Sequence, residues 1–248
     1  MKVLDYIQHR LQREKLHMTL IDPEDTSPFV AGKMAGIAAK VGSDAIMVGG
    51  STGITMDKMD AIVKEIRLHC RRLPIILFPS SSASISRYAD AIYFMSLLNS
   101  RNVRLIVREQ ARGAPLIKKM GIEPIAMGYL IIEPGMTVGK VGEAEVIKRD
   151  SIDEAVGYAL AAQYLGMELL YLEAGSGAPE PVPPAMITAI KHEIDLPLIV
   201  GGGIRTAKIV ESVLAAGADI IVTGTAVESA DDLDGKLTEI VKAVRDFV

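Results

Sequence analysis

Two glycine-rich segments in the last fifth of the chain could bind an anion. Gly201, Gly202 and Gly203 stand between an apolar run and a segment that begins at Thr206, and Gly224 follows the next apolar run. Glycines between a strand and a helix let the backbone turn tightly and present N–H groups, to which the helix dipole adds positive potential. Two such turns are typical of the phosphate site after strands 7 and 8 of a (β/α)8 barrel. Tight turns without a ligand are the alternative.

Two carboxylates end apolar runs and could take part in chemistry. Asp22 shares a strand face with Leu20 and could bind Mg²⁺, or it could cap the turn before Pro23. Glu173 shares a face with Tyr171 and could accept a proton from a substrate hydroxyl. A buried Glu173 paired with a neighbouring cation is the alternative.

Hydroxyls and an aromatic ring are further candidates for the same end of the strands. The glycine pair 49–50 precedes Ser51 and Thr52, whose hydroxyls could donate to phosphate or help to coordinate magnesium. A site of Asp22 and Ser51 alone indicates a metal bound together with a diphosphate, because Mg²⁺ takes few carboxylates and completes its shell with phosphate and water. Tyr129 could stabilise a cation with its ring, or simply pack in the core.

An apolar groove is a less specific expectation. The segment after the third strand, 80–84, is rich in small residues, and the helix that follows it is expected to be short. The room left there could be lined by the residues of the fourth strand and its end, namely Tyr93, Phe94, Met95, Leu97 and Leu98. Such a strand is also typical of ordinary core packing.

These residues require a scaffold that brings the ends of many strands together. Apolar runs alternate with helical patterns at about 30-residue spacing, which predicts a parallel sheet. We predict a single (β/α)8 TIM-barrel domain over 1–248, with an extra N-terminal helix at 3–14 that closes the bottom; a doubly wound sheet is the alternative. We expect an irregular loop at 133–142 and a helix capped by Ser151. The expected strands are 16–22, 44–48, 74–78, 91–95, 123–132, 169–173, 196–200 and the run from 220 to Gly224.

Composition excludes several classes of function. The net charge of −4 gives no basis for nucleic-acid binding, and one cysteine, Cys70, excludes an internal disulfide. No apolar run reaches the roughly 18 residues of a membrane span, and the N-terminus has no signal-peptide pattern. We therefore expect a cytoplasmic protein.

Five motifs in chain order resemble the geranylgeranylglyceryl phosphate synthase family. They are TLIDPE at 19–24, MVGGST at 47–52, YLEAGSG at 171–177, VGGGIR at 200–205 and VTGT at 222–225. The resemblance implies a Mg²⁺-dependent prenyltransferase that joins sn-glycerol 1-phosphate to geranylgeranyl diphosphate through an ether bond, a step of archaeal membrane-lipid synthesis. An allylic carbon tolerates cationic character, so the attacking glycerol hydroxyl needs to be correctly positioned but requires only a modest base.

The resemblance also assigns roles to residues. Glu173 is expected to be the base, Tyr129 to stabilise allylic cation character, and Asp22 and Ser51 to bind magnesium. The glycerol-phosphate site implied by the family comprises Tyr171, Leu172, Glu173, Ala174, Gly175, Ser176, Gly177, Gly202, Gly203, Gly224 and Thr225.

Assembly, donor length and reaction class stay open at this point. Oligomers are usual in the family, and Lys140 offers no aromatic anchor for a larger assembly, so a dimer is expected. An apolar substrate also implies transient contact with a membrane surface. The alternatives are a longer prenyl donor, an isomerase or lyase of sugar phosphates that shares only the phosphate site, and a non-catalytic phosphate sensor.

Overall fold

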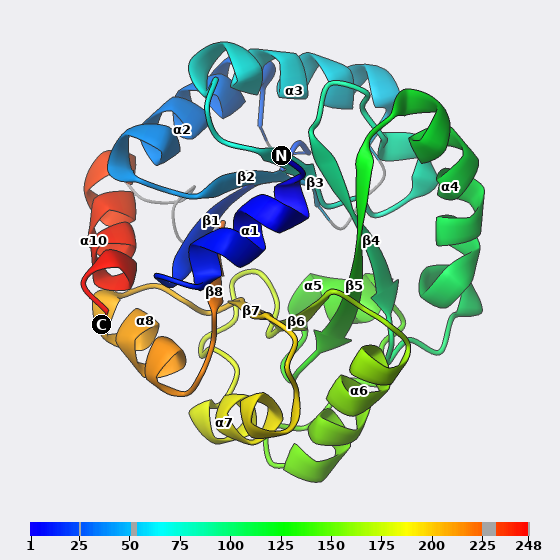
Figure 1. Cartoon of the computed structure of the whole chain (residues 1–248), viewed down its shortest axis with the longest axis vertical. Coiled ribbons are helices and arrows are strands. Elements are labelled where there is room, and N and C mark those ends of the chain that lie inside the picture. The colour runs from blue at the N-terminus through cyan, green and yellow to red at the C-terminus, as the bar shows by residue number, and fades with distance from the viewer. Residues whose placement is uncertain (25, 51–53, 225–231, 248) are drawn as a thin grey trace.

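Eight parallel strands close into a barrel in the computed structural model, which describes residues 1–24, 26–50, 54–224 and 232–247 (Figure 1). Each strand pairs with the next, and β8 pairs with β1, so the predicted (β/α)8 barrel is confirmed. The strands are β1 Leu16–Ile21, β2 Ala45–Val48, β3 Ile75–Leu77, β4 Ala91–Leu97, β5 Glu123–Ile131, β6 Leu169–Glu173, β7 Leu198–Gly201 and β8 Ile220–Thr223.

Helices surround the barrel and bury its outer face (Figure 1). They are α2 Pro28–Val41, α3 Met56–His69, α4 Glu109–Met120, α6 Ile152–Tyr164, α7 Pro184–Glu193, α8 Ala207–Ala215 and α10 Leu233–Arg245. Two further helices are α1 Val3–Leu11 and α5 Met136–Val141. Alternate strand residues face two separate apolar layers: Leu170 and Leu172 pack toward the helices, whereas Leu169 and Tyr171 fill the barrel. No helix in the described part of the chain has the length and apolar character needed to cross a membrane.

The connection between β3 and β4 is the irregular part of the barrel. It contains only a single 3-10 turn, η1 Ser82–Ser84, in place of a full helix, which confirms the expected shortness of this element. The next connection begins with a π-helical turn, η2 Arg104–Arg108, that continues into α4. Since π turns are frequent at functional sites and η1 is the single helical turn between β3 and β4, this side of the barrel is a place where a ligand could enter.

Two local predictions were wrong. The segment 133–142 is not irregular throughout, because 136–141 form α5. Ser151 stands at the N-cap of α6, but its side chain makes no capping hydrogen bond. By contrast, Thr206 caps α8, since its hydroxyl accepts a hydrogen bond from the Ile209 N–H.

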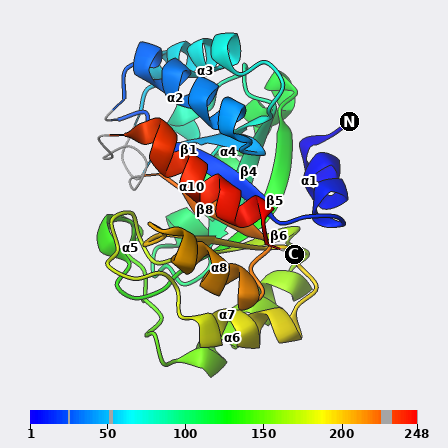
Figure 2. The same ribbon diagram turned by 90° about the vertical axis from the view of Figure 1, so that its left-hand side faces the viewer.

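Helix α1 lies across the end of the barrel at which the strands begin, and α5 lies at the opposite end (Figure 2). Glu123, the first residue of β5, holds the first turn of α1. Its carboxylate accepts hydrogen bonds from the backbone N–H groups of Val3 and Leu4. Ile7 is fully buried against the barrel interior. The predicted extra N-terminal helix therefore closes the bottom of the barrel.

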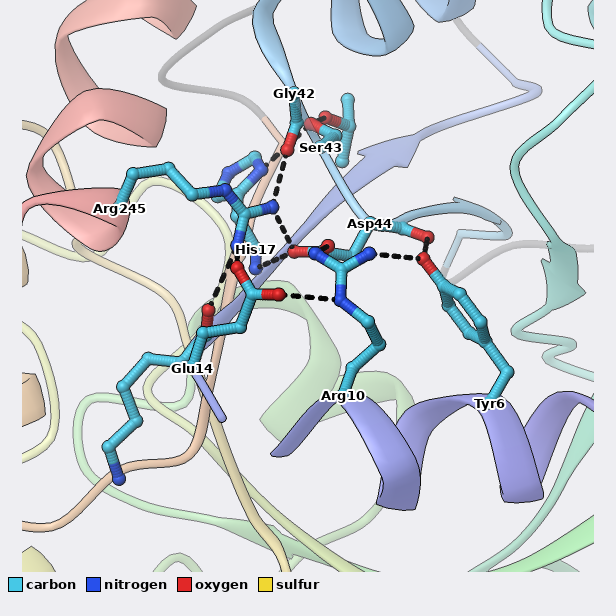
Figure 3. A network of polar contacts seen from close by, with 10 residues as sticks. Tyr6, Arg10, Glu14, His17, Gly42, Ser43, Asp44 and Arg245 are labelled. Carbon is cyan, nitrogen blue, oxygen red and sulfur yellow. Dashed lines mark hydrogen bonds and ion pairs between the residues drawn. The ribbon is translucent and has the colours of Figure 1, made fainter. Parts of the chain in front are cut away.

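A polar network ties both ends of the chain to this closed end (Figure 3). Asp44, just before β2, has a buried carboxylate that pairs with Arg10 of α1 and Arg245 of α10, each at 2.7 Å. The same carboxylate accepts a hydrogen bond from the His17 backbone N–H at 2.9 Å. Burial raises the pKa of Asp44, and the hydrogen bond from His17 and the two arginines act in the opposite direction. The side chain of Glu14 connects the two arginines.

We expect Asp44→Ala to lower the free energy of unfolding by about 3 kcal/mol, because two arginines and a buried N–H lose their common acceptor. In a chain of this size that loss corresponds to a fall in melting temperature of roughly 6–12 °C. The control is Asp234→Ala, since Asp234 pairs with Lys40 at the surface, where the two side chains expose 47% and 73%; it should change stability by less than about 1 kcal/mol. Equal melting curves for the two variants would contradict the importance of the network.

Candidate functional site

Two cavities meet at the carboxyl ends of the strands, and Glu173 lines both of them. The larger has a volume of about 570 Å³ and extends past β3 and β4 to the inner face of α4. The smaller has a volume of about 180 Å³ and lies over β6, β7 and β8. The residues common to both are Leu20, Glu173, Ser176 and Gly224.

Glu173 is the last residue of β6, and only 6% of its surface is exposed. Its Oε1 accepts a hydrogen bond of 2.6 Å from the Gly175 N–H, which fixes the carboxylate at the junction of the cavities. Its Oε2 lies 3.5 Å from the Tyr129 hydroxyl. Burial raises the pKa of Glu173, while the hydrogen bonds from Gly175, Tyr171 and Tyr129 act against that rise. A buried carboxylate with a raised pKa is suited to accept a proton.

Four aromatic rings form the floor beneath Glu173. Phe78 stacks on Tyr171 with ring centroids 5.6 Å apart, and Tyr129 meets both of them edge to face. Tyr93 completes the group against Phe78. Burial and the neighbouring carboxylate raise the pKa of Tyr129 and Tyr171 well above the usual value, so both phenols are neutral donors. The ring of Tyr129 also lines the large cavity, as expected from its strand position.

The small cavity is built on glycines whose conformation and surroundings exclude side chains. Gly202 and Gly203 have φ values of +83° and +71°, in the left-handed region. A Cβ on Gly202 would stand 2.5 Å from Glu173 Oε1, and one on Gly203 would stand 2.5 Å from the carbonyl of Glu180. Gly175 and Gly177 have positive φ as well. This geometry brings the backbone close to whatever occupies the cavity.

Positive charge lines the other wall of the small cavity. Arg205 borders it and donates a hydrogen bond of 2.8 Å to the Gly177 carbonyl. The N-terminus of α8 follows at once, with its positive dipole end next to the glycines. A phosphate group fits the size and charge of this cavity. Arg205 was not among the predicted site residues, although the motif that ends with it was recognised.

Asp22 stands at the mouth of the barrel and lines the large cavity, on the same side as Leu20. Its Oδ1 accepts a hydrogen bond of 2.8 Å from the Glu24 N–H. Gly50 faces this carboxylate so closely that a Cβ there would clash with both oxygens. The pair thus forms a small cradle with hard oxygen donors, the ligand type that Mg²⁺ prefers.

The large cavity is mainly apolar away from Asp22. Tyr93, Phe94, Met95 and Leu97 line it as predicted, together with Ser80, Ser81 and Ser82; Leu98 does not. Its inner end lies between Ile85 of the β3–β4 connection and the α4 residues Gly113 and Ile117. The missing helix between β3 and β4 leaves this space open, which is the physical basis that the sequence suggested.

The remaining predicted residues divide into two groups. The side chains of Leu172 and Ala174 belong to the apolar layer under the helices, so only their backbone could contact a ligand. Ser51 and Thr225 lie outside the described residues, and their parts in the metal and phosphate sites stay predictions. Phe78, which the sequence placed only at a strand end, contacts three aromatic rings of the floor.

Comparison with known proteins connects this geometry to one family. Residues 9–244 match the PcrB family. The chain is 57% identical to geranylgeranylglyceryl phosphate synthase of Thermococcus kodakarensis over 98% of both chains. The corresponding protein of Methanothermobacter thermautotrophicus is 50% identical over 98% of this chain and 99% of its own.

A solved structure agrees with the sequence relatives. The crystal structure of (S)-3-O-geranylgeranylglyceryl phosphate synthase from Thermoplasma acidophilum superimposes with a TM-score of 0.96, at 44% identity and with 99% of each chain covered. That structure was determined in complex with its substrate, sn-glycerol-1-phosphate.

Proposed function

This chain belongs to the PcrB family and is a prenyltransferase of the geranylgeranylglyceryl phosphate synthase type, and on that premise we propose that it joins sn-glycerol 1-phosphate to geranylgeranyl diphosphate. The products are geranylgeranylglyceryl phosphate and diphosphate, and the ether lipid serves archaeal membranes. The observation that carries the proposal is the position of Glu173, on the wall shared by a small cationic cavity and a large apolar one.

The two substrates fit the two cavities. We place the phosphate of glycerol phosphate at Gly202, Gly203 and Arg205, which leaves a glycerol hydroxyl directed toward Glu173. The prenyl chain occupies the large cavity between β4 and α4. Both reacting groups then converge on the one buried carboxylate, so positioning supplies much of the rate enhancement.

The transfer step takes place beside Glu173, where the two cavities meet. The glycerol hydroxyl oxygen attacks C1 of the prenyl chain, the bond from C1 to the diphosphate oxygen breaks, and the hydroxyl proton passes to Glu173. The Gly175 N–H holds Glu173 in place, and neutral Tyr129, whose hydroxyl lies 3.5 Å from Glu173, lines the large cavity, where its ring would stabilise positive charge on the allylic carbon.

Magnesium fits the Asp22 side of the large cavity. Among the described residues, no group of three or more His, Cys, Asp and Glu side chains could hold a metal by itself, so diphosphate oxygens would have to complete the shell. Asp22, in the cradle made by Gly50, would hold the ion together with Ser51, which lies outside the described residues. The ion would supply neutralisation of the charge that builds on the departing diphosphate.

A donor series tests the proposed reaction. The protein is incubated with sn-glycerol 1-phosphate, magnesium and prenyl diphosphates of increasing length, and the organic extract is examined by mass spectrometry. We expect the geranylgeranyl donor to give the highest kcat/KM. Preference for a longer donor would show that geranylgeranyl diphosphate is not the natural donor. The absence of product with every donor would favour an isomerase or lyase of sugar phosphates instead.

Gly203→Ala should raise the KM for glycerol phosphate by about tenfold or more. Its Cβ would meet the Glu180 backbone at 2.5 Å, and the glycine turn must move to relieve that contact. Gly121→Ala is the matched control, because Gly121 has nearly the same φ of +73° with open space around it. The control should lose stability without a change in KM; a normal KM for Gly203→Ala would exclude this turn from the phosphate site.

Gly113→Leu should shorten the prenyl chain that the enzyme accepts. The new side chain would fill the end of the large cavity next to Ile85, which lies only 3.3 Å from the position of a Cβ. Overpacking of roughly 1–3 kcal/mol predicts a loss of about ten- to a hundredfold in kcat/KM for geranylgeranyl diphosphate. Farnesyl diphosphate should be used almost normally. Ala111→Leu, on the exposed face of α4, should leave both donors unaffected.

We propose a homodimer as the assembly. The support is Lys140, an exposed lysine on α5 where an aromatic anchor for a larger assembly would be needed. Light scattering should give twice the chain mass, and a hexamer would contradict the proposal.

A further inference from the structure

The outer rim of the large cavity combines exposed arginines with exposed valines. Arg101, Arg104 and Arg108 are exposed, and Val103 and Val107 between them expose 49% and 54% of their surfaces. Val141 of α5, 49% exposed, lines the cavity itself. We call these six residues the basic rim.

The two parts of the basic rim lie side by side at the mouth of the cavity. The Arg101 N–H donates a hydrogen bond of 3.0 Å to the Glu143 carbonyl, just beyond α5. Arg104 and Leu105 of η2 line the same cavity as Val138 and Val141 of α5. Exposed apolar and cationic side chains therefore border the opening through which the prenyl chain would enter.

The charge of this region is opposite to that of the whole protein. Residues 101–119 contain six Arg and Lys and one carboxylate, a net charge of +5 in a chain whose total is −4. That carboxylate, Glu109, faces inward, where it accepts hydrogen bonds from the backbone and the hydroxyl of Ser82. Glu109 also pairs with Arg104 of the rim at 3.8 Å. Glu143, just beyond α5, accepts a hydrogen bond of 2.7 Å from the Asn102 amide.

We infer that the basic rim docks on an anionic lipid surface, with the arginines at phosphate headgroups and the valines between them. Clustered Arg and Lys are attracted to anionic lipids, and exposed apolar side chains add binding when they enter the interface. A second copy of this chain is a poor occupant, because a two-fold interface would set the same positive patch against itself. Docking of the basic rim would place the mouth of the large cavity at the membrane, so that the prenyl donor and the lipid product need not cross water.

Binding of the basic rim to lipid does not depend on the proposed function. Only the passage of prenyl donor and lipid product between the membrane and the cavity rests on it. Vesicle binding needs no turnover, so an inactive protein that binds vesicles, or an active one that does not, separates the two proposals.

Vesicle sedimentation with the full-length protein tests the rim. We expect binding to vesicles of equimolar phosphatidylglycerol and phosphatidylcholine, weaker binding at high salt, and little binding to phosphatidylcholine alone. The double variant Arg101→Glu, Arg108→Glu should lower binding about tenfold or more. Its matched control is Lys208→Glu, Lys242→Glu, on α8 and α10 across the barrel from α4 (Figure 1).

A second pair of variants tests the apolar part. Val107→Ser should weaken vesicle binding severalfold, whereas Leu165→Ser, at an exposed leucine just after α6, should not. Equal losses in rim and control variants would overturn the inference, as would equal binding to neutral and anionic vesicles. A rim variant that changes the mass in light scattering but not vesicle binding would assign the surface to another copy of the chain.

Discussion

Glu173→Gln should lower kcat by about a hundred- to ten-thousandfold, the range expected when a general base is lost. The amide oxygen can still accept the Gly175 N–H hydrogen bond that orients the side chain, so the shape of both cavities should persist. Binding of glycerol phosphate, measured by calorimetry, should therefore change by only a few-fold. The loss is expected in turnover because the amide cannot accept the hydroxyl proton.

The pH dependence gives Glu173 a second test. The reactive form is the carboxylate, so the rate should fall as the pH drops through the pKa of this group. Because burial raises that pKa, the fall should begin at a higher pH than for an exposed glutamate. This acidic limb should disappear in Glu173→Gln. Glu168→Gln, at the opposite end of β6, should retain both the rate and the limb; a wild-type rate in Glu173→Gln would remove the base role.

Asp22→Ala should lower kcat/KM by at least about a hundredfold, because charge stabilisation by a metal is worth several kcal/mol. Binding has its own measurement. Magnesium together with diphosphate should raise the melting temperature of the wild-type protein, and the rise should be absent in Asp22→Ala. Asp57→Ala, an exposed carboxylate in the first turn of α3, is the control and should keep the rise.

Gly50→Ala tests the same site without removing a charge. Its Cβ would clash with both carboxylate oxygens of Asp22, so the carboxylate must turn away. The variant should share the weaker magnesium response of Asp22→Ala. An unchanged response in both variants would place the metal elsewhere.

The strand ends were predictable because they depend on local pattern. Alternation along β6 correctly predicted that Tyr171 and Glu173 share a face, which the structure directs into the barrel. Apolar runs located all eight strands to within a few residues. The sequence also predicted a short helix between β3 and β4, and therefore room for a groove; the structure has only the 3-10 turn η1 there.

Features that depend on distant contacts were not predictable. Helix α5 contains Gly139, which argues against a helix; Gly139 is buried close to Val146, and tertiary packing outweighs its low propensity. Phe78 is one apolar residue among many in the sequence, and only the closed barrel sets it beside Tyr129 and Tyr171. Asp44 likewise acquires its partners from both ends of the chain.

One mass spectrum tests the central claim most directly. The protein is incubated with sn-glycerol 1-phosphate, magnesium and geranylgeranyl diphosphate that carries ¹⁸O at the oxygen bonded to C1. The products are then analysed by mass spectrometry. If the glycerol oxygen attacks C1 at Glu173, the products contain an unlabelled prenyl ether of glycerol phosphate, and all the label leaves with diphosphate. Label retained in a prenyl alcohol, or no ether product, would contradict the account.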